Sequence, residues 1–303
     1  MRRACLAISV ALAAQLAPPP AAAQSLAAKG PWTLSADAES CVLRREFVDG
    51  ENLAYLELRR FYPGDLQMVV ASNTLRATET NSLRYRLNDD QEWRNDTSKV
   101  PTETSTGYGG VIFFPVLFEV PGLNEVKDDA QRQALLVKLD LDALEQDAAA
   151  KVGTLTLLDA FDEDLSLQVG SLARPLALMN DCVEELMSHW NIDAEAHKTL
   201  SRGAAVLSSR RASLTDFPPL SSLFGQYAPS AISIRLDISE KGKVENCHFY
   251  KVGGDPGAAA ASCAKLRRGL RFEPALDKDG EAIASFYTYR LIFPRREPSS
   301  PSP

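Results

Sequence analysis

Hydrophobic and polar residues alternate most regularly in the last quarter of the chain. Residues 232–238 alternate strictly, which predicts a strand with one buried face. A hairpin turn follows, in which Gly242 can take a positive φ, and residues 244–252 form the second strand. Asp255 is a suitable helix cap, and residues 282–293 read as a last strand. The pattern therefore predicts a strand–strand–helix–strand module with one exposed sheet edge.

The first two thirds of the chain also read mainly as strands. Residues 51–59 and 65–71 alternate on either side of Pro63-Gly64, which is typical of a hairpin. Residues 111–118 form an apolar run in which Pro115 requires a sheet edge or a bulge. Helical spacing occurs in residues 128–150 and in a helix that starts at Pro175. This region is expected to form a β-rich sandwich or barrel.

We therefore expect an α+β protein with two domains. The β-rich N-terminal domain covers residues 25–192, and the C-terminal module covers residues 215–294. Residues 193–214 are rich in Ser, Ala and Arg and are expected to be a linker, with a short helix within residues 194–206. Residues 295–303 are rich in Pro and Ser and are expected to be a disordered tail.

The first 24 residues have the pattern of a secretory signal peptide. Arg2 and Arg3 precede an apolar run, and small residues before Gln24 or Ser25 suit a cleavage site. The run has about 14 residues, fewer than the roughly 20 that span a bilayer, so cleavage is favoured over an uncleaved anchor. No later stretch is long and apolar enough to cross a membrane. The mature chain is expected in the periplasm of a Gram-negative bacterium.

Four cysteines follow the signal peptide: Cys41, Cys182, Cys247 and Cys263. An even number in an exported chain suggests disulfides, although four cysteines allow three pairings. Closeness in the sequence favours Cys247–Cys263 within the module and Cys41–Cys182 within the N-terminal domain. A zinc site is the disfavoured alternative, because the chain has no Cys-x-x-Cys pair and only 3 histidines.

The composition is ordinary for a folded protein, but the charge is uneven. The formal net charge is −7. Residues 232–296 hold 12 basic and 8 acidic residues, a balance of +4, whereas residues 25–231 hold 19 basic and 31 acidic residues, a balance of −12. An acidic domain joined to a basic one argues against a nucleic-acid binder. The basic module could meet an acidic partner, but solvated surface charge is the commoner explanation.

Motifs of common enzyme classes do not occur in the sequence. It has no Gly-x-Ser-x-Gly elbow, no P-loop and no His-Glu-x-x-His. The carboxylates of Asp159, Asp162, Glu163 and Asp164 lack the spacing of a calcium loop, so a solvated turn is favoured. We expect no catalytic residues, cofactor or metal. An enzyme with an unrecognised site in the N-terminal domain is left open as an alternative.

Short motifs of the module occur at fixed places along its expected elements. They are Phe217-Pro218 at the start, Lys241-Gly242-Lys243-Val244, Gly254-Asp255-Pro256, and Arg271-Phe272-Glu273-Pro274-Ala275. With this order of elements, residues 215–294 resemble the C-terminal domain of TonB-type energy transducers. The chain departs from that family at Thr215-Asp216, where the family has Gln-Pro. It also lacks the anchor helix and the long Pro-rich spacer of typical transducers.

The resemblance implies a binding function. In the family, the last strand receives a short segment of an outer-membrane receptor by β-augmentation. The corresponding strand here carries the candidate partner-binding residues Ser285, Tyr287, Tyr289, Leu291 and Phe293. We therefore expect a periplasmic protein that binds a protein partner of the envelope, with TonB-dependent receptors as the implied class. The alternative is a structural or assembly protein without transport coupling, whose strand edge is covered by the N-terminal domain or by a second copy in a homodimer.

Overall fold

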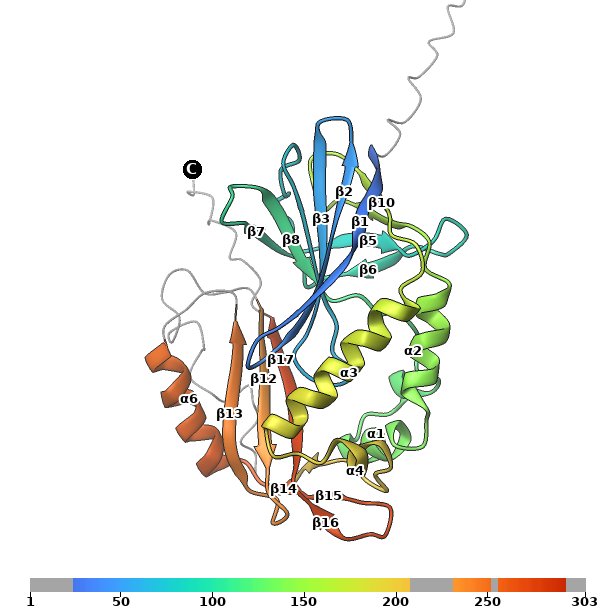
Figure 1. The fold of residues 1–303 in the computed structure, drawn as a ribbon. Coiled ribbons are helices and arrows are strands. Elements are labelled where there is room, and N and C mark those ends of the chain that lie inside the picture. Colours follow the sequence, from blue (N-terminus) through green and yellow to red (C-terminus); the bar gives the residue numbers. More distant parts are fainter. Residues whose placement is uncertain (1–23, 208–230, 252–255, 293–303) are drawn as a thin grey trace, which may run out of the picture.

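Figure 1 shows the computed structural model of the chain, which describes residues 24–207, 231–251 and 256–292. Four expectations fall outside these ranges: residues 1–23 of the signal peptide, the start of the module at residues 215–230, Phe293, and the tail at residues 295–303. The fold is mixed α+β and rich in strands, as the sequence predicts. No helix of the described ranges is long and apolar enough to span a membrane.

Ten strands of the N-terminal domain form one sheet. In the order of the sheet they are β6 (Arg94–Asp96), β5 (Leu83–Arg86), β9 (Leu155–Leu158), β10 (Leu165–Gln168), β1 (Gln24–Ala36), β2 (Cys41–Asp49), β3 (Asn52–Arg60), β4 (Gln67–Ser72), β8 (Gly109–Phe113) and β7 (Val100–Glu103). The neighbours are antiparallel except β1 and β10. Strand β8 ends before Pro115, as its ring requires.

This single curled sheet corrects the expected sandwich or barrel. A sandwich has two sheets, and a closed barrel requires its outermost strands to pair. Here β6 and β7 end the sheet and do not pair with each other. The long strand β1 joins both parts of the domain, because residues 24–27 pair with β10 and residues 27–36 pair with β2. The ladder shifts register between Lys29 and Thr33, where Pro31 has no N–H to donate.

The helices of the N-terminal domain lie where the periodicity predicts them. Helices α1 (Asp129–Leu136) and α2 (Leu141–Ala150) fall within residues 128–150, after the short 3-10 helix η1 (Leu123–Glu125). The Asp140 carboxylate caps α2 by accepting the Ala143 N–H at 2.9 Å. Helix α3 (Ala173–His189) buries an apolar face in the main core through Leu176, Met179, Val183 and Leu186, and Met187 is buried beside them in the helix. In Figure 1, α3 runs from the sheet toward the C-terminal strands.

The C-terminal module has the predicted strand–strand–helix–strand order. Its elements are β12 (Ala231–Ile238), β13 (Val244–Lys251), α6 (Pro256–Gly269), β14 (Phe272–Glu273), β15 (Ala275–Leu276), β16 (Ala282–Ile283) and β17 (Ser285–Ile292). The main sheet is antiparallel with the order β13-β12-β17, so β17 is an edge strand. The expected last strand at residues 282–293 is divided, because β16 pairs with β15 in a separate hairpin.

One face of this small sheet forms the core of the module. Ile234, Leu236 and Ile238 pack with Leu266 and Leu270 at the end of α6. Gly242 takes φ 68° in the β12–β13 turn, as predicted. A side chain there would meet the Phe272 carbonyl oxygen, which would lie 1.9 Å from an added Cβ, so the turn requires glycine.

The segment expected to be a linker is partly folded. Within residues 193–214, α4 (Ala194–Lys198) is capped by Asp193, and β11 (Ala205–Val206) pairs with β14 of the module. Leu200, Ala204 and Val206 pack against the core of the module. Residues 194–206 therefore belong to the module, because its apolar core is incomplete without them.

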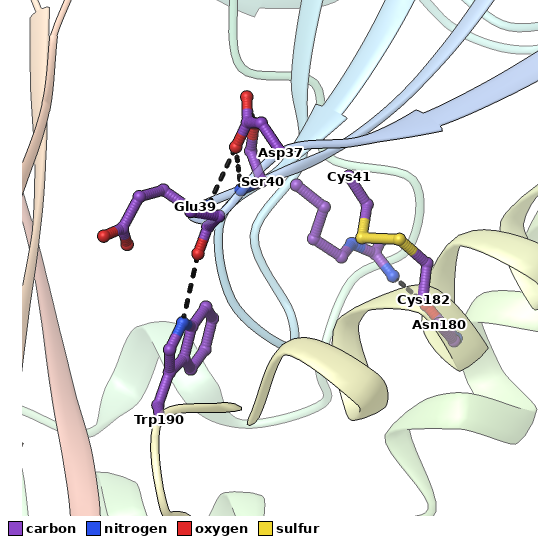
Figure 2. The surroundings of a disulfide bond; sticks show 9 residues. Asp37, Glu39, Ser40, Cys41, Asn180, Cys182 and Trp190 are labelled. Carbon is purple, nitrogen blue, oxygen red and sulfur yellow. Dashed lines mark hydrogen bonds between the residues drawn. A yellow bond between two sulfur atoms is a disulfide. The ribbon is translucent and has the colours of Figure 1, made fainter. Parts of the chain in front are cut away.

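Both predicted disulfides are present, Cys41–Cys182 and Cys247–Cys263. The first joins the start of β2 to α3, and the second joins β13 to α6. In Figure 2, the first bridge lies beside the β1–β2 turn at Asp37–Ser40. Two disulfides suit an extracytoplasmic location.

Lys99 is a buried cation that the sequence gives no reason to expect. Lys99 is only 1% exposed. Its Nζ donates hydrogen bonds to neutral oxygens of Thr78 and Thr80 and to the backbone carbonyl oxygen of Asp159. Burial lowers the pKa of Lys99 to about 8, although the Asp159 charge opposes this. The ammonium fastens the loop after β4 to the end of β9.

We expect removal of the two disulfides to affect stability unequally. The Cys41→Ala/Cys182→Ala variant should lose about 4–5 kcal/mol of unfolding free energy, because its bridge closes a separation of 141 residues. Cys247→Ala/Cys263→Ala should lose about 3 kcal/mol, because its separation is 16 residues. Urea unfolding of both variants measures the difference. A larger loss for the second variant would contradict this account.

Candidate functional site

The second face of the module sheet lies against the N-terminal domain. On β12 the side chains of Ser233, Arg235 and Asp237 point to this face, and Ser233 and Arg235 are buried. The Arg235 guanidinium carbon lies 3.4 Å from the centroid of the Trp190 ring at the end of α3. Its Nε donates to Asp237 at 3.0 Å. Its two terminal nitrogens have no hydrogen-bond partner among the described residues, so the indole ring is their main neighbour.

The β1–β2 turn reaches the same face through Glu39. The Tyr250 hydroxyl donates to Glu39 at 3.0 Å, and His248 Nδ1 lies 3.5 Å from the other Glu39 oxygen. In Figure 2, Glu39 points away from the disulfide toward the C-terminal strands, while Trp190 donates its indole N–H to the turn at Ala38. The Cys41–Cys182 bridge therefore holds together the two segments that receive the module.

Aromatic rings complete the contact between the module sheet and the N-terminal domain, which we call the junction. Phe61 stacks on Tyr250 with ring centroids 4.5 Å apart, and Tyr62 lies 6.5 Å from Phe286 of β17. Phe61, Tyr62 and Tyr250 are buried together. Stacking of this kind stabilises an interface beyond the area that it buries. The junction thus has the character of a protein interior.

A large groove opens beside the junction. We call it the junction groove; its volume is about 1150 Å³, and its walls come from both domains. The N-terminal domain contributes the β3–β4 turn, the segment after β8, the end of α1, the start of α2 and part of α3. The remaining walls are α4 with the residues that follow it, and β17. Pockets for small ligands measure roughly 300–1000 Å³, so this groove has room for a larger ligand.

Strand β17 presents its edge to the junction groove. The successive residues Ser285, Phe286, Tyr287 and Thr288 all line it, as does Arg290. Side chains alternate between the two faces of a strand, so a cavity over one face would be lined by every second residue. Lining by successive residues indicates that the cavity lies along the edge. Among the described strands, β17 pairs only with β12.

Two ion pairs line the groove. Arg60 binds Glu145 through both terminal nitrogens, at 2.6 and 3.2 Å, and also donates to Asn180. Asp65 is paired with Arg290 of β17, whose guanidinium carbon lies 3.6 Å from the Phe114 ring centroid. Arg60 also donates to the Asp65 carbonyl oxygen at 2.6 Å. This network connects α2, α3 and the β3–β4 turn with the module.

Two carboxylates of the groove have raised pKa values. Burial raises the pKa of Asp65, and the charges of Arg290 and Arg60 offset this only in part. Burial raises the pKa of Asp142, and the neighbouring carboxylates raise it further, with Glu145 having the largest effect among them. The pKa of Asp237 in the junction is lowered instead, because the hydrogen bond from His248 and the charge of Arg235 outweigh burial.

His197 joins α4 to β17. Its Nδ1 lies 2.8 Å from the Asp193 carbonyl oxygen, which only accepts, and its Nε2 lies 2.8 Å from the Ser285 hydroxyl. The neutral ring therefore carries its proton on Nδ1 and accepts from Ser285. Burial lowers the pKa of His197, against the opposing effect of Asp193. The ring also stacks on Phe286, with centroids 5.6 Å apart.

The structure brings the candidate partner-binding residues onto one strand but gives them different surroundings. Ser285 is buried and bonded to His197, and Tyr287 packs on Phe272 with centroids 5.0 Å apart. Tyr289 lies on β17 opposite Ile234 of β12. Leu291 belongs to β17, and its side chain lies outside the described residues, as does Phe293. Within the described ranges, no group of His, Cys, Asp and Glu could hold a metal ion.

Most of the junction was not foreseen from the sequence. The alternation on β12 was read for its apolar face, although the charged residues on its polar face were a usable signal for a second interface. The partners Trp190 and Glu39 are 45 and 196 residues from Arg235 and carry no such signal. Comparisons with protein-family models, curated proteins and solved structures found no match to the chain.

We expect Arg235 and Trp190 to be energetically coupled. A double-mutant cycle with Arg235→Met and Trp190→Leu should give a coupling of about 1–2 kcal/mol in unfolding free energy, because the contact is desolvated. The matched control is Arg86 with Trp93, a more exposed pair at 4.6 Å, whose coupling should be smaller. Equal couplings for the two pairs would contradict a special role of the junction.

The lowered pKa of His197 predicts a loss of stability in acid. Its stabilising contribution is complete above the unfolded pKa of about 6.5 and is lost as the pH falls through the lower folded pKa. Between about pH 8 and about pH 5, the wild type should lose more unfolding free energy than His197→Gln, which keeps hydrogen-bonding groups without titrating. The control variant is His189→Gln, at an exposed position of α3, which should behave like the wild type. Parallel pH profiles for wild type and His197→Gln would exclude this effect.

Proposed function

We propose that this protein binds an extended segment of a protein partner in the bacterial envelope, by adding that segment as a strand to the edge of β17. The observation that carries this proposal is that successive residues of β17 line the junction groove. A strand edge offers N–H and C=O groups in a row, so an extended peptide gains main-chain hydrogen bonds there. The binding protein would be periplasmic, in keeping with its two disulfides.

The surroundings of β17 favour a specific site over an unprotected edge. An unprotected edge strand promotes aggregation, and proteins usually cover or charge it. Here the N-terminal domain and α4 line the groove beside the edge, so the edge is partly covered. The groove volume of about 1150 Å³ agrees with a ligand larger than a small molecule.

The resemblance to TonB C-terminal domains suggests the class of partner. The resemblance implies that β17 corresponds to the receptor-binding strand of that family, and the order of β12, β13, α6 and β17 supports this proposal. We therefore propose TonB-dependent outer-membrane receptors as the partner class. The N-terminal domain is an addition to the TonB-like module, and docking without energy transduction is the role that we propose.

Binding is favoured over catalysis by the state of the groove's charged groups. Glu145 is held by Arg60, and Asp65 is paired with Arg290. Carboxylates engaged in this way stabilise the junction and have little freedom to transfer protons to a substrate. A purely structural role would require only the junction and would leave the groove without a ligand, which a capture experiment can decide.

The edge hypothesis predicts the effect of proline in β17. Successive N–H groups of a strand point to opposite edges, so in Thr288→Pro and Tyr289→Pro one variant loses an N–H toward β12 and the other loses an N–H toward the groove. The latter should stay folded and lose capture of peptides selected from a random display library on the mature wild-type protein. Fluorescence polarisation measures capture, and thermal unfolding identifies the folded variant. Wild-type capture by both variants would refute the placement.

A second measurement uses the selected peptide itself. N-methylation at successive positions should weaken binding at every second position, because only alternate N–H groups face β17. Uniform tolerance of N-methylation would contradict β-augmentation. A pull-down of outer-membrane extract on the mature protein tests the partner class. Retention of a TonB-dependent receptor is expected, and capture of peptides without any receptor would count against that class alone.

A further inference from the structure

Away from β17, one part of the lining of the junction groove is apolar. It consists of Val116, Leu117 and Val120 from the segment after β8, and of Leu136, Val137 and Leu139 from the end of α1 and the turn that follows; we call these six residues the apolar wall. None of them is buried, and Val116 is 49% exposed. The other five are half-buried, and Leu117 also packs against the main core, so each keeps some apolar surface that another molecule could cover.

Most charged groups that line the groove already have a partner in the protein, so they do not favour a charged ligand. Arg60 is paired with Glu145, Arg290 with Asp65, and Lys198 with Glu184. Asp140 caps α2, and Arg132 donates to the carbonyl oxygen of Val126. Lys138 and Asp142 are exposed at the rim and have opposite charges. The groove therefore offers apolar side chains along one wall and a strand edge along the other, with little net charge between them.

We infer that the N-terminal domain selects the partner of β17: the apolar wall binds large uncharged side chains on an extended segment whose backbone pairs with β17. This inference rests on the proposed function and extends it from backbone capture to side-chain recognition. Main-chain hydrogen bonds to a strand edge do not distinguish between sequences, so selectivity requires a surface that reads the side chains. The wall supplies that surface, and it belongs to the domain outside the TonB-like module.

The chemistry of the two walls fits one kind of occupant. A strand paired with β17 has its backbone in the plane of the sheet and directs side chains to both faces, where those nearest the wall meet apolar atoms. A charged side chain there would lose hydration without gaining a partner, which costs free energy. Branched or aromatic apolar residues would bury area instead. The partner segment is therefore an extended run containing Val, Ile, Leu or Phe and no charge at the positions that face the wall.

The test compares two substitutions of similar exposure. Val116→Asp changes the wall, and Leu178→Asp changes an exposed leucine of α3 that does not line the groove, with exposures of 49% and 45%. Random peptides are selected by display on the mature wild-type protein, and their affinities are then measured for both variants and for the folded β17 proline variant. We expect the selected peptides to be rich in large apolar residues. Their affinity should fall at least about tenfold in Val116→Asp and stay unchanged in Leu178→Asp.

The outcomes distinguish a failure of this inference from a failure of the proposed function. If the β17 variant loses binding but Val116→Asp keeps it, the edge binds peptide and the apolar wall does not select it. If no peptide is enriched, both statements are wrong. Thermal unfolding and sedimentation complete the test. A lower unfolding temperature in Val116→Asp alone would show that another part of this chain covers the wall, and dissociation of a dimer by Val116→Asp would show that a second copy does; either result overturns the proposal.

Discussion

The stacking of Arg235 on Trp190 is the contact on which the arrangement of the two domains depends. A guanidinium that is completely buried at the centre of β12 has to be compensated, since an isolated buried charge is very costly. Asp237 of the same strand supplies part of that compensation, and the indole ring and Glu39 supply the rest only when the module is docked. The charge therefore favours one orientation of the module, in which β17 faces the N-terminal domain across a groove.

The disulfides support this arrangement from both sides. Cys41–Cys182 ties the beginning of β2 to α3, and so positions both the turn that carries Glu39 and the helix that ends at Trp190. Cys247–Cys263 ties α6 to β13 on the opposite face of the module sheet. Each face of the small sheet is thus covered by a crosslinked unit, and its edges are the surfaces left for another strand. A further strand could therefore pair with this sheet only at an edge, because both faces are already used.

Local patterns predicted the elements well and their assembly less well. Alternation identified β12, β13 and the β3–β4 hairpin, and helical spacing identified α1, α2 and α3, because these patterns reflect burial of one face. The sheet was predicted as a sandwich or barrel and is a single curled sheet, because β1 pairs with strands from both ends of the domain. Residues 194–206 read as linker because five residues of helix and two of strand are too short to give a periodic signal.

The sequence by itself determined the four paired cysteines, the apolar faces of the elements and the order of the elements in the module. These depend on spacing along the chain, which a sequence records directly. Only the tertiary structure decided which surfaces meet: that Arg60 contacts Glu145, that Asp65 contacts Arg290, and that the end of α1 lines the same groove as β17. The contact of Asp65 with Arg290, 225 positions apart, follows from how the domains dock, and that of Arg60 with Glu145, 85 positions apart, follows from packing within the N-terminal domain. Docking is governed by compensation of buried charge and by shape, and neither leaves a periodic pattern in the chain.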